Sequence, residues 1–103
     1  MLDKKFIDLI YSRIAHRYAK SRIYLFGSHV YGNPEPGSDI DIAVILHEVS
    51  SKVCEANKIY DLLDDIPYPK DIVVSSDKEF DHFRNQAGSI FRTISEKGLL
   101  LHE

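Results

Sequence analysis

Residues 22–46 read RIYLFGSHVYGNPEPGSDIDIAVIL and contain the signals that decide the fold. Residues 22–26 and 39–46 are dense in aromatic and branched apolar side chains, which predicts two short strands, the first stopping at Gly27. Residues 32–38 between them contain two prolines and two glycines, so they predict a loop. Because this loop is too short for an ordinary helical crossover, we expect the two strands to pair antiparallel.

The flanking segments predict helices and one more strand. Apolar residues at helical spacing predict helices over residues 2–20, 51–65 and 76–97, the last broken near Gly88, and a short apolar run predicts a strand over residues 71–74. Gly98 is placed as a C-cap before an apolar tail. The order of these elements predicts an α+β (α/β) fold, with a small sheet covered by helices.

Composition limits the class of protein. The chain has 103 residues, of which 44% are hydrophobic, and this predicts one domain over residues 1–103 with a real core. A net charge of −3 argues against nonspecific binding to nucleic acid or acidic membranes. The sequence shows no secretory signal, and its longest apolar run is far below the roughly 20 residues of a membrane span, so we expect a cytoplasmic protein.

Two carboxylates open the second predicted strand. Side chains two apart on a strand share a face about 6–7 Å apart, so Asp39 and Asp41 are expected on one face and Ile40 on the other. Two ionised aspartates on a short face repel one another, and something positive should offset that cost. Carboxylate oxygens suit hard divalent ions such as Mg²⁺, which binds through one or two carboxylates and substrate phosphates.

Two further features complete a candidate site. The Gly27-Ser28 turn leaves a strand and can start a short helix, whose first N–H groups bind phosphate oxygens. Asp71 opens the third predicted strand as Asp39 and Asp41 open the second, so on a neighbouring strand it would converge on the same ions. Three such carboxylates make a two-metal centre for in-line displacement, with Asp71 able to help deprotonate an incoming hydroxyl.

These residues carry a family resemblance. The pattern of Gly27-Ser28, ten further residues and Asp39-x-Asp41, with Asp71 on a later strand, resembles the nucleotidyltransferase superfamily of DNA polymerase β. Within it the chain is similar to the minimal nucleotidyltransferases, the MNT antitoxins that pair with HEPN-domain toxins. The resemblance covers nearly the whole chain.

The resemblance implies a mixed sheet flanked by helices and Mg²⁺-dependent transfer of a nucleoside monophosphate from an NTP. For the MNT group it implies AMP transfer from ATP to a tyrosine of a HEPN-family partner, which silences the partner's ribonuclease activity. Gly27 and Ser28 would hold triphosphate oxygens, and Asp39 and Asp41 would ligate both metals. Asp71 would ligate the catalytic metal and aid the acceptor hydroxyl.

Two alternatives stay open. The first alternative to this enzyme is a non-catalytic antitoxin that neutralises its toxin by docking. The second keeps nucleotidyl transfer but directs it to RNA or a small molecule. No basic face or aromatic platform stands out for direct RNA binding, and we see no extra domain for a small-molecule pocket. His29 is interpreted as a surface residue and Cys54 as a small residue that is at least half-buried.

Overall fold

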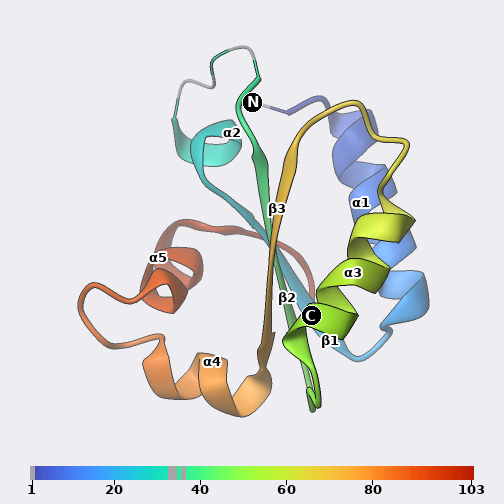
Figure 1. Ribbon diagram of the computed structural model, residues 1–103. Helices are drawn as coiled ribbons and strands as arrows, with labels where there is room; N and C mark the ends of the chain where they lie inside the picture. Colours follow the sequence, from blue (N-terminus) through green and yellow to red (C-terminus); the bar gives the residue numbers. More distant parts are fainter. Residues whose placement is uncertain (1, 33–34, 36) are drawn as a thin grey trace.

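Helices cover both faces of one small sheet in the computed structural model, which describes residues 2–32, 35 and 37–103 (Figure 1). Residues 33, 34 and 36 of the predicted loop lie outside the described residues. The elements in chain order are α1 (Lys4–Arg17), β1 (Ser21–Phe26), α2 (Ser28–Tyr31), β2 (Ile40–Leu46), α3 (Lys52–Leu62), β3 (Lys70–Ser76), α4 (Asp77–Phe83), α5 (Ile90–Lys97) and β4 (Leu99–His102). Among the described residues, no helix is both long and apolar enough to cross a membrane.

The sheet is mixed, with strand order β3-β2-β1-β4. β1 pairs antiparallel with both β2 and β4, while β2 pairs parallel with β3. The antiparallel pairing predicted for the first two strands is therefore confirmed, as is the fold class. The ends at which β2 and β3 begin and β1 stops lie together at the end of the sheet that carries α2 (Figure 1).

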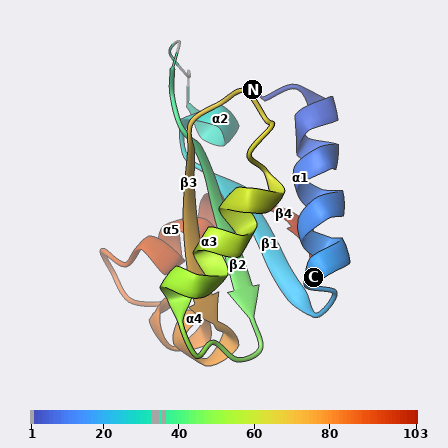
Figure 2. The same cartoon turned by 45° about the vertical axis from the view of Figure 1, so that its right-hand side comes forward.

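Each face of the sheet has its own hydrophobic cluster. On one face, Ile10 and Ile14 of α1 and Ile59 of α3 pack with strand residues such as Ile42. On the other face, α4 and α5 bring buried aromatic and branched residues against β1 and β2. Figures 1 and 2 show α1 and α3 on one side of the strands and α4 and α5 on the other. The paired clusters explain why β2 is apolar on both faces beyond its first residues.

Local capping fixes where the helices begin. The side chains of Asp3, Ser51, Ser76 and Ser89 each accept a hydrogen bond from a backbone N–H in the first turn of the helix that follows. Such caps satisfy N–H groups that have no partner inside a helix. The segment predicted as one broken helix over residues 76–97 is thus two helices, α4 and α5, and Ser89 caps the second.

Gly98 is the C-cap of α5 as predicted, but the strands extend differently from the expectation at two places. The tail after Gly98 is a strand, because Leu99 and Leu100 pair with β1 and extend the sheet. The second strand begins at Ile40 and not at Asp39, so Asp39 stands one residue before the hydrogen-bonded ladder. Ile40 and Ile42 do lie on the face opposite Asp41, in the cluster under α1 and α3.

We expect Phe80→Ala to lower the free energy of unfolding by about 3–5 kcal/mol, because large-to-small changes of buried aromatic residues leave a cavity. The Phe80 side chain has 0% exposure and packs in the cluster under α4 and α5. Denaturant unfolding measures the change. As a control, Val53→Ala removes methyl groups that are 72% exposed and should change stability by less than about 0.5 kcal/mol. A loss below about 1 kcal/mol in the Phe80 variant would contradict the packing described.

Candidate active site at the end of the sheet

The turn between β1 and α2 depends on Gly27. Its φ of 82° and ψ of −164° lie in a region that is essentially reserved for glycine. A Cβ atom at this position would lie 1.9 Å from Oδ2 of Asp41. The backbone of the turn therefore lies against the Asp41 carboxylate, and the Cβ of any other residue at position 27 would collide with that carboxylate.

Pairing of the strands places two of the three predicted carboxylates side by side. Asp41 of β2 is opposite Phe26 of β1 and level with Asp71 of β3. Asp41 is partly buried, whereas Asp71 and Asp39 are exposed. The sequence analysis made convergence of Asp71 depend on its strand lying next to the second one, and β3 does pair with β2. Asp39 precedes the ladder, so its position is set by the chain leading into β2.

The electrostatics of Asp41 reflect this crowding. Partial burial is the main cause that raises the pKa of its carboxyl group above the ordinary value. The negative charges of Asp71 and Asp39 raise the pKa further, and His29 opposes the shift. The charges of Asp39 and Asp71 therefore both act on Asp41 and disfavour its ionised form.

The donor set suits a hard divalent ion, although the side chains are not gathered into a cage. Within residues 2–32, 35 and 37–103, no three Asp, Glu, His or Cys side chains stand close enough together to hold a metal ion. Two observations fit Mg²⁺: every candidate ligand is a carboxylate, and the charge on Asp41 is disfavoured until a cation arrives.

Ser28 begins α2, immediately after the glycine turn. The turn is held by a hydrogen bond from Val30 N–H to the Gly27 carbonyl, 3.0 Å, and by one from Gly32 N–H to the Ser28 carbonyl, 3.1 Å. The first N–H groups of a helix have no partner inside it. Ser28 is half-buried and follows Gly27 directly as the first residue of α2, and its role in holding phosphate stays a prediction.

His29 and Cys54 differ from expectation. The His29 side chain has 7% exposure and Nε2 lies 3.0 Å from the Ser38 carbonyl oxygen, so it is not a surface residue. A four-residue helix shows no periodicity that would reveal an inward side, and the contact crosses a loop. Cys54, which was expected to be at least half-buried, is exposed on α3.

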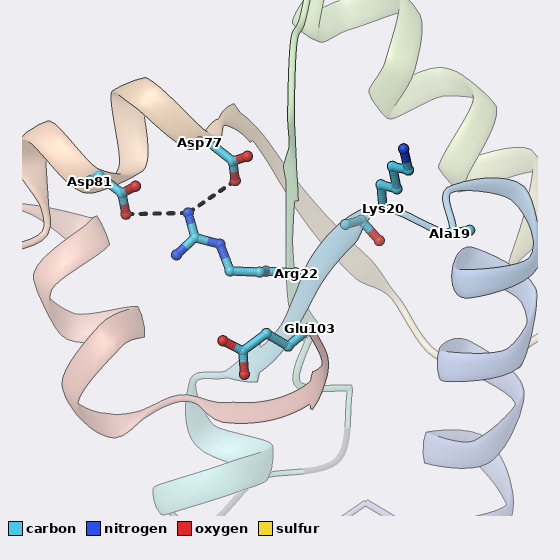
Figure 3. A pocket seen from close by; sticks show the side chains of 7 residues that line it. Ala19, Lys20, Arg22, Asp77, Asp81 and Glu103 are labelled. Carbon is cyan, nitrogen blue, oxygen red and sulfur yellow. Dashed lines mark hydrogen bonds and ion pairs between the residues drawn. The ribbon is translucent and has the colours of Figure 1, made fainter.

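A hollow lies at the opposite end of β1 and is lined by none of the predicted site residues. It has a volume of about 560 Å³, and Arg22 stands in it between Asp77 and Asp81 (Figure 3). Its guanidinium is 3.0 Å from Asp77 and 3.2 Å from Asp81 and stacks 4.8 Å from the centre of the Phe80 ring. These contacts join β1 to α4, so the arginine is engaged in holding the fold.

The family model for the nucleotidyltransferase domain matches residues 7–99. The chain therefore belongs to the nucleotidyltransferase domain family. A comparison with curated proteins gives no significant match.

Solved structures share the fold at low sequence identity. A toxin–antitoxin structure with AMP-PNP aligns with a TM-score of 0.67 and 22% identity, covering 97% of this chain and 73% of the other. The MntA-HepT toxin–antitoxin aligns with a TM-score of 0.64 and 20% identity over 96% of this chain and 71% of the other. A Sulfolobus solfataricus protein whose nucleotidyltransferase assignment is provisional aligns with a TM-score of 0.63 and 20% identity, covering 93% and 76%.

We expect Gly27→Ala to destabilise the protein by more than the roughly 1–3 kcal/mol that a glycine-only backbone conformation costs, because the new Cβ also collides with Asp41. Gly88→Ala is the matched control, since Gly88 has a φ of 81° and no atom within 4 Å of the added Cβ. Unfolding in denaturant compares the two. Equal losses in both variants would show that the approach of Gly27 to Asp41 is not tight.

A pH dependence follows from the raised pKa of Asp41. The folded protein holds the proton of the Asp41 carboxyl more tightly than the unfolded chain does. Protonated Asp41 therefore favours the folded state below the ordinary pKa of 3.8, and this contribution to stability is lost as pH rises through the pKa of Asp41 in the folded protein. In the absence of divalent ions we expect Asp41→Asn to be more stable than wild type at pH 7 and to lose that advantage below pH 3.8. Thermal unfolding across pH measures this.

The control for that experiment is Glu48→Gln, which neutralises an exposed carboxylate in the loop after β2. It should leave the difference between pH 7 and acid unchanged. If Asp41→Asn is instead less stable than wild type at pH 7, the carboxylate is stabilising in the metal-free fold and the repulsion described above is refuted.

Proposed function

We propose that this chain is a Mg²⁺-dependent nucleotidyltransferase that moves AMP from ATP to a tyrosine of a HEPN-family toxin ribonuclease, and that it thereby acts as an antitoxin. One observation carries the proposal. Asp41 lies against the Gly27 turn and is level with Asp71, so the turn proposed to bind phosphate and two carboxylates proposed to hold the metal share one end of the sheet.

Two comparisons support the proposal at different levels. Membership of the nucleotidyltransferase family supports a transferase and a nucleotide substrate. The fold is shared with toxin–antitoxin structures, one of them with AMP-PNP, and this supports ATP as the nucleotide and a toxin as the partner.

Each residue of the site has a proposed role that follows from its chemistry. Gly27 and Ser28 would hold triphosphate oxygens, since the close turn exposes backbone N–H groups and a hydroxyl. Asp39, Asp41 and Asp71 would hold Mg²⁺, which supplies charge neutralisation on the attacking and leaving oxygens. The raised pKa of Asp41 is consistent with this role, because a bound cation removes the repulsion that disfavours its ionised form.

The proposed reaction is an in-line displacement. The oxygen of the acceptor hydroxyl forms a bond to the α-phosphorus of ATP as the bond from that phosphorus to the bridging oxygen breaks. Pyrophosphate leaves with the electron pair, and Asp71 accepts the proton of the hydroxyl as general base. Asp71 is exposed at the start of the edge strand β3, where an acceptor can approach from outside the chain.

The acceptor side is the reason for proposing a protein substrate. Asp71 is exposed at the edge of the sheet, where a partner can reach it, and the partner would supply the tyrosine. Action on a HEPN-family toxin also places the protein in the cytoplasm. Direct nucleic-acid binding is not part of the proposal.

The test incubates the purified protein with Mg²⁺, ATP labelled at the α-phosphate and a HEPN-family toxin encoded beside it. We expect label on a toxin tyrosine. Asp39→Asn and Asp41→Asn should reduce labelling to background, because each removes a charge that would hold the metal, and chelation by EDTA should do the same. Glu48→Gln is the control and should label as wild type does.

Two outcomes would contradict parts of the proposal. Unchanged labelling in either aspartate variant would overturn the two-metal mechanism. If the Asp39→Asn variant does not label the toxin yet protects cells from it as well as wild type does, inhibition proceeds by docking and the chain is a non-catalytic antitoxin. Label transferred to RNA or a small molecule in place of the toxin would overturn the HEPN partner.

A further inference from the structure

His29 is a buried polar side chain that the proposed chemistry does not use. Its ring has 7% exposure and meets the edge of Tyr68, with centroids 5.8 Å apart and planes at 85°. Its Nε2 lies 3.0 Å from the carbonyl oxygen of Ser38. The side chain therefore links α2 to the chain entering β2 and to the segment before β3.

The bond to Ser38 assigns the ring's proton. A carbonyl oxygen can only accept, so Nε2 donates and, in the neutral ring, Nδ1 is left as an acceptor. Nδ1 is buried and has no hydrogen-bond partner in the part of the chain that the structure describes. An apolar side chain would fill this space without burying an unpaired nitrogen, so packing alone does not explain a histidine here. The donation to Ser38 does.

Ser38 matters because its carbonyl belongs to the peptide that leads directly into Asp39. Asp39 stands one residue before β2, so the sheet ladder does not fix that peptide. On the other side, Ile40 N–H donates to the Pro69 carbonyl oxygen at 2.8 Å. The two peptide units that flank Asp39 are thus tied by two separate bonds, and His29 makes the first of them.

We propose that His29 is a positioning residue for Asp39: its Nε2–H fixes the Ser38 peptide and so aims a carboxylate that the sheet does not hold. This inference rests on the proposed function, in which Asp39 holds Mg²⁺. Groups that orient a metal ligand from behind typically change metal affinity by about 10–100-fold when they are removed. The buried ring and its engaged Nε2 leave His29 unsuited to binding phosphate directly.

Three variants separate the hydrogen bond from packing. His29→Gln carries an amide N–H₂ that reaches about as far as Nε2, and it should retain the bond to Ser38. His29→Asn has the same amide on a shorter stem and should not reach. His29→Leu fills the space without a donor. If the leucine variant fails to fold, the glutamine and asparagine pair still decides, because both carry the same polar amide and differ only in its reach.

The first measurement uses metal-free, ¹⁵N-labelled protein. We expect the Asp39 amide, which shares its peptide unit with the Ser38 carbonyl, to shift and gain fast motion in His29→Leu and His29→Asn and to stay near wild type in His29→Gln. An Asp39 amide that does not respond in the leucine variant, or that responds equally in the two amide variants, would overturn the inference. Thermal unfolding of each variant accompanies the spectra.

The second measurement titrates Mn²⁺, as a spectroscopic substitute for Mg²⁺, into each protein saturated with AMP-PNP. We expect affinity to fall at least tenfold in His29→Leu and His29→Asn and to stay within threefold of wild type in His29→Gln, following the usual range for such groups. Equal Mn²⁺ affinity in all four proteins would overturn the inference. A wild-type protein that binds no Mn²⁺ would overturn the proposed function and the metal-directed role of His29, whereas the metal-free spectra test the Asp39 contact by itself.

Discussion

The approach of Gly27 to the Asp41 carboxylate is the constraint on which the rest of the site depends. A Cβ at Gly27 would lie 1.9 Å from Oδ2 of Asp41, so strand β1 must end in a residue without a side chain at the point where β2 carries its charge. The antiparallel register that sets Phe26 opposite Asp41 brings the turn to this place. The parallel register with β3 then adds Asp71 beside it. Asp41 therefore lies against the glycine turn on one side and is level with Asp71 on the other.

The protein can fold with these carboxylates close together because their repulsion is confined to one end of the sheet. Repulsion among the carboxylates and partial burial raise the pKa of Asp41, while the two hydrophobic clusters on either face of the sheet are apolar throughout. Three like charges in the interior would be prohibitive, whereas at the end of the sheet solvent and a bound cation can offset them. The hydrophobic clusters that stabilise the fold therefore lie apart from the carboxylates whose repulsion destabilises it.

Much of this arrangement follows from local sequence, and the exceptions have physical causes. The carboxylates, the glycine turn and the antiparallel pairing of the first two strands were predictable because alternation and loop length act over a few residues, whereas the pairing of the Asp71 strand with β2 spans a helix and was left as a condition. β4 was missed because a short leucine run after a helix looks the same whether it pairs or not, and its pairing with β1 bridges more than seventy positions. His29 was misjudged because its burial depends on Ser38 and Tyr68, which reach it from other parts of the chain.

The burial of β2 also restricts how a protein of this kind can diversify. From Ile42 to Leu46 every residue of the strand is buried, so a carboxylate placed farther along would have no route to water. The chemistry is therefore anchored to the first residues of the strand and cannot migrate along it. Variation in the choice of nucleotide or acceptor has to arise in the turns around the first residues of the strand, away from the apolar centre of the sheet.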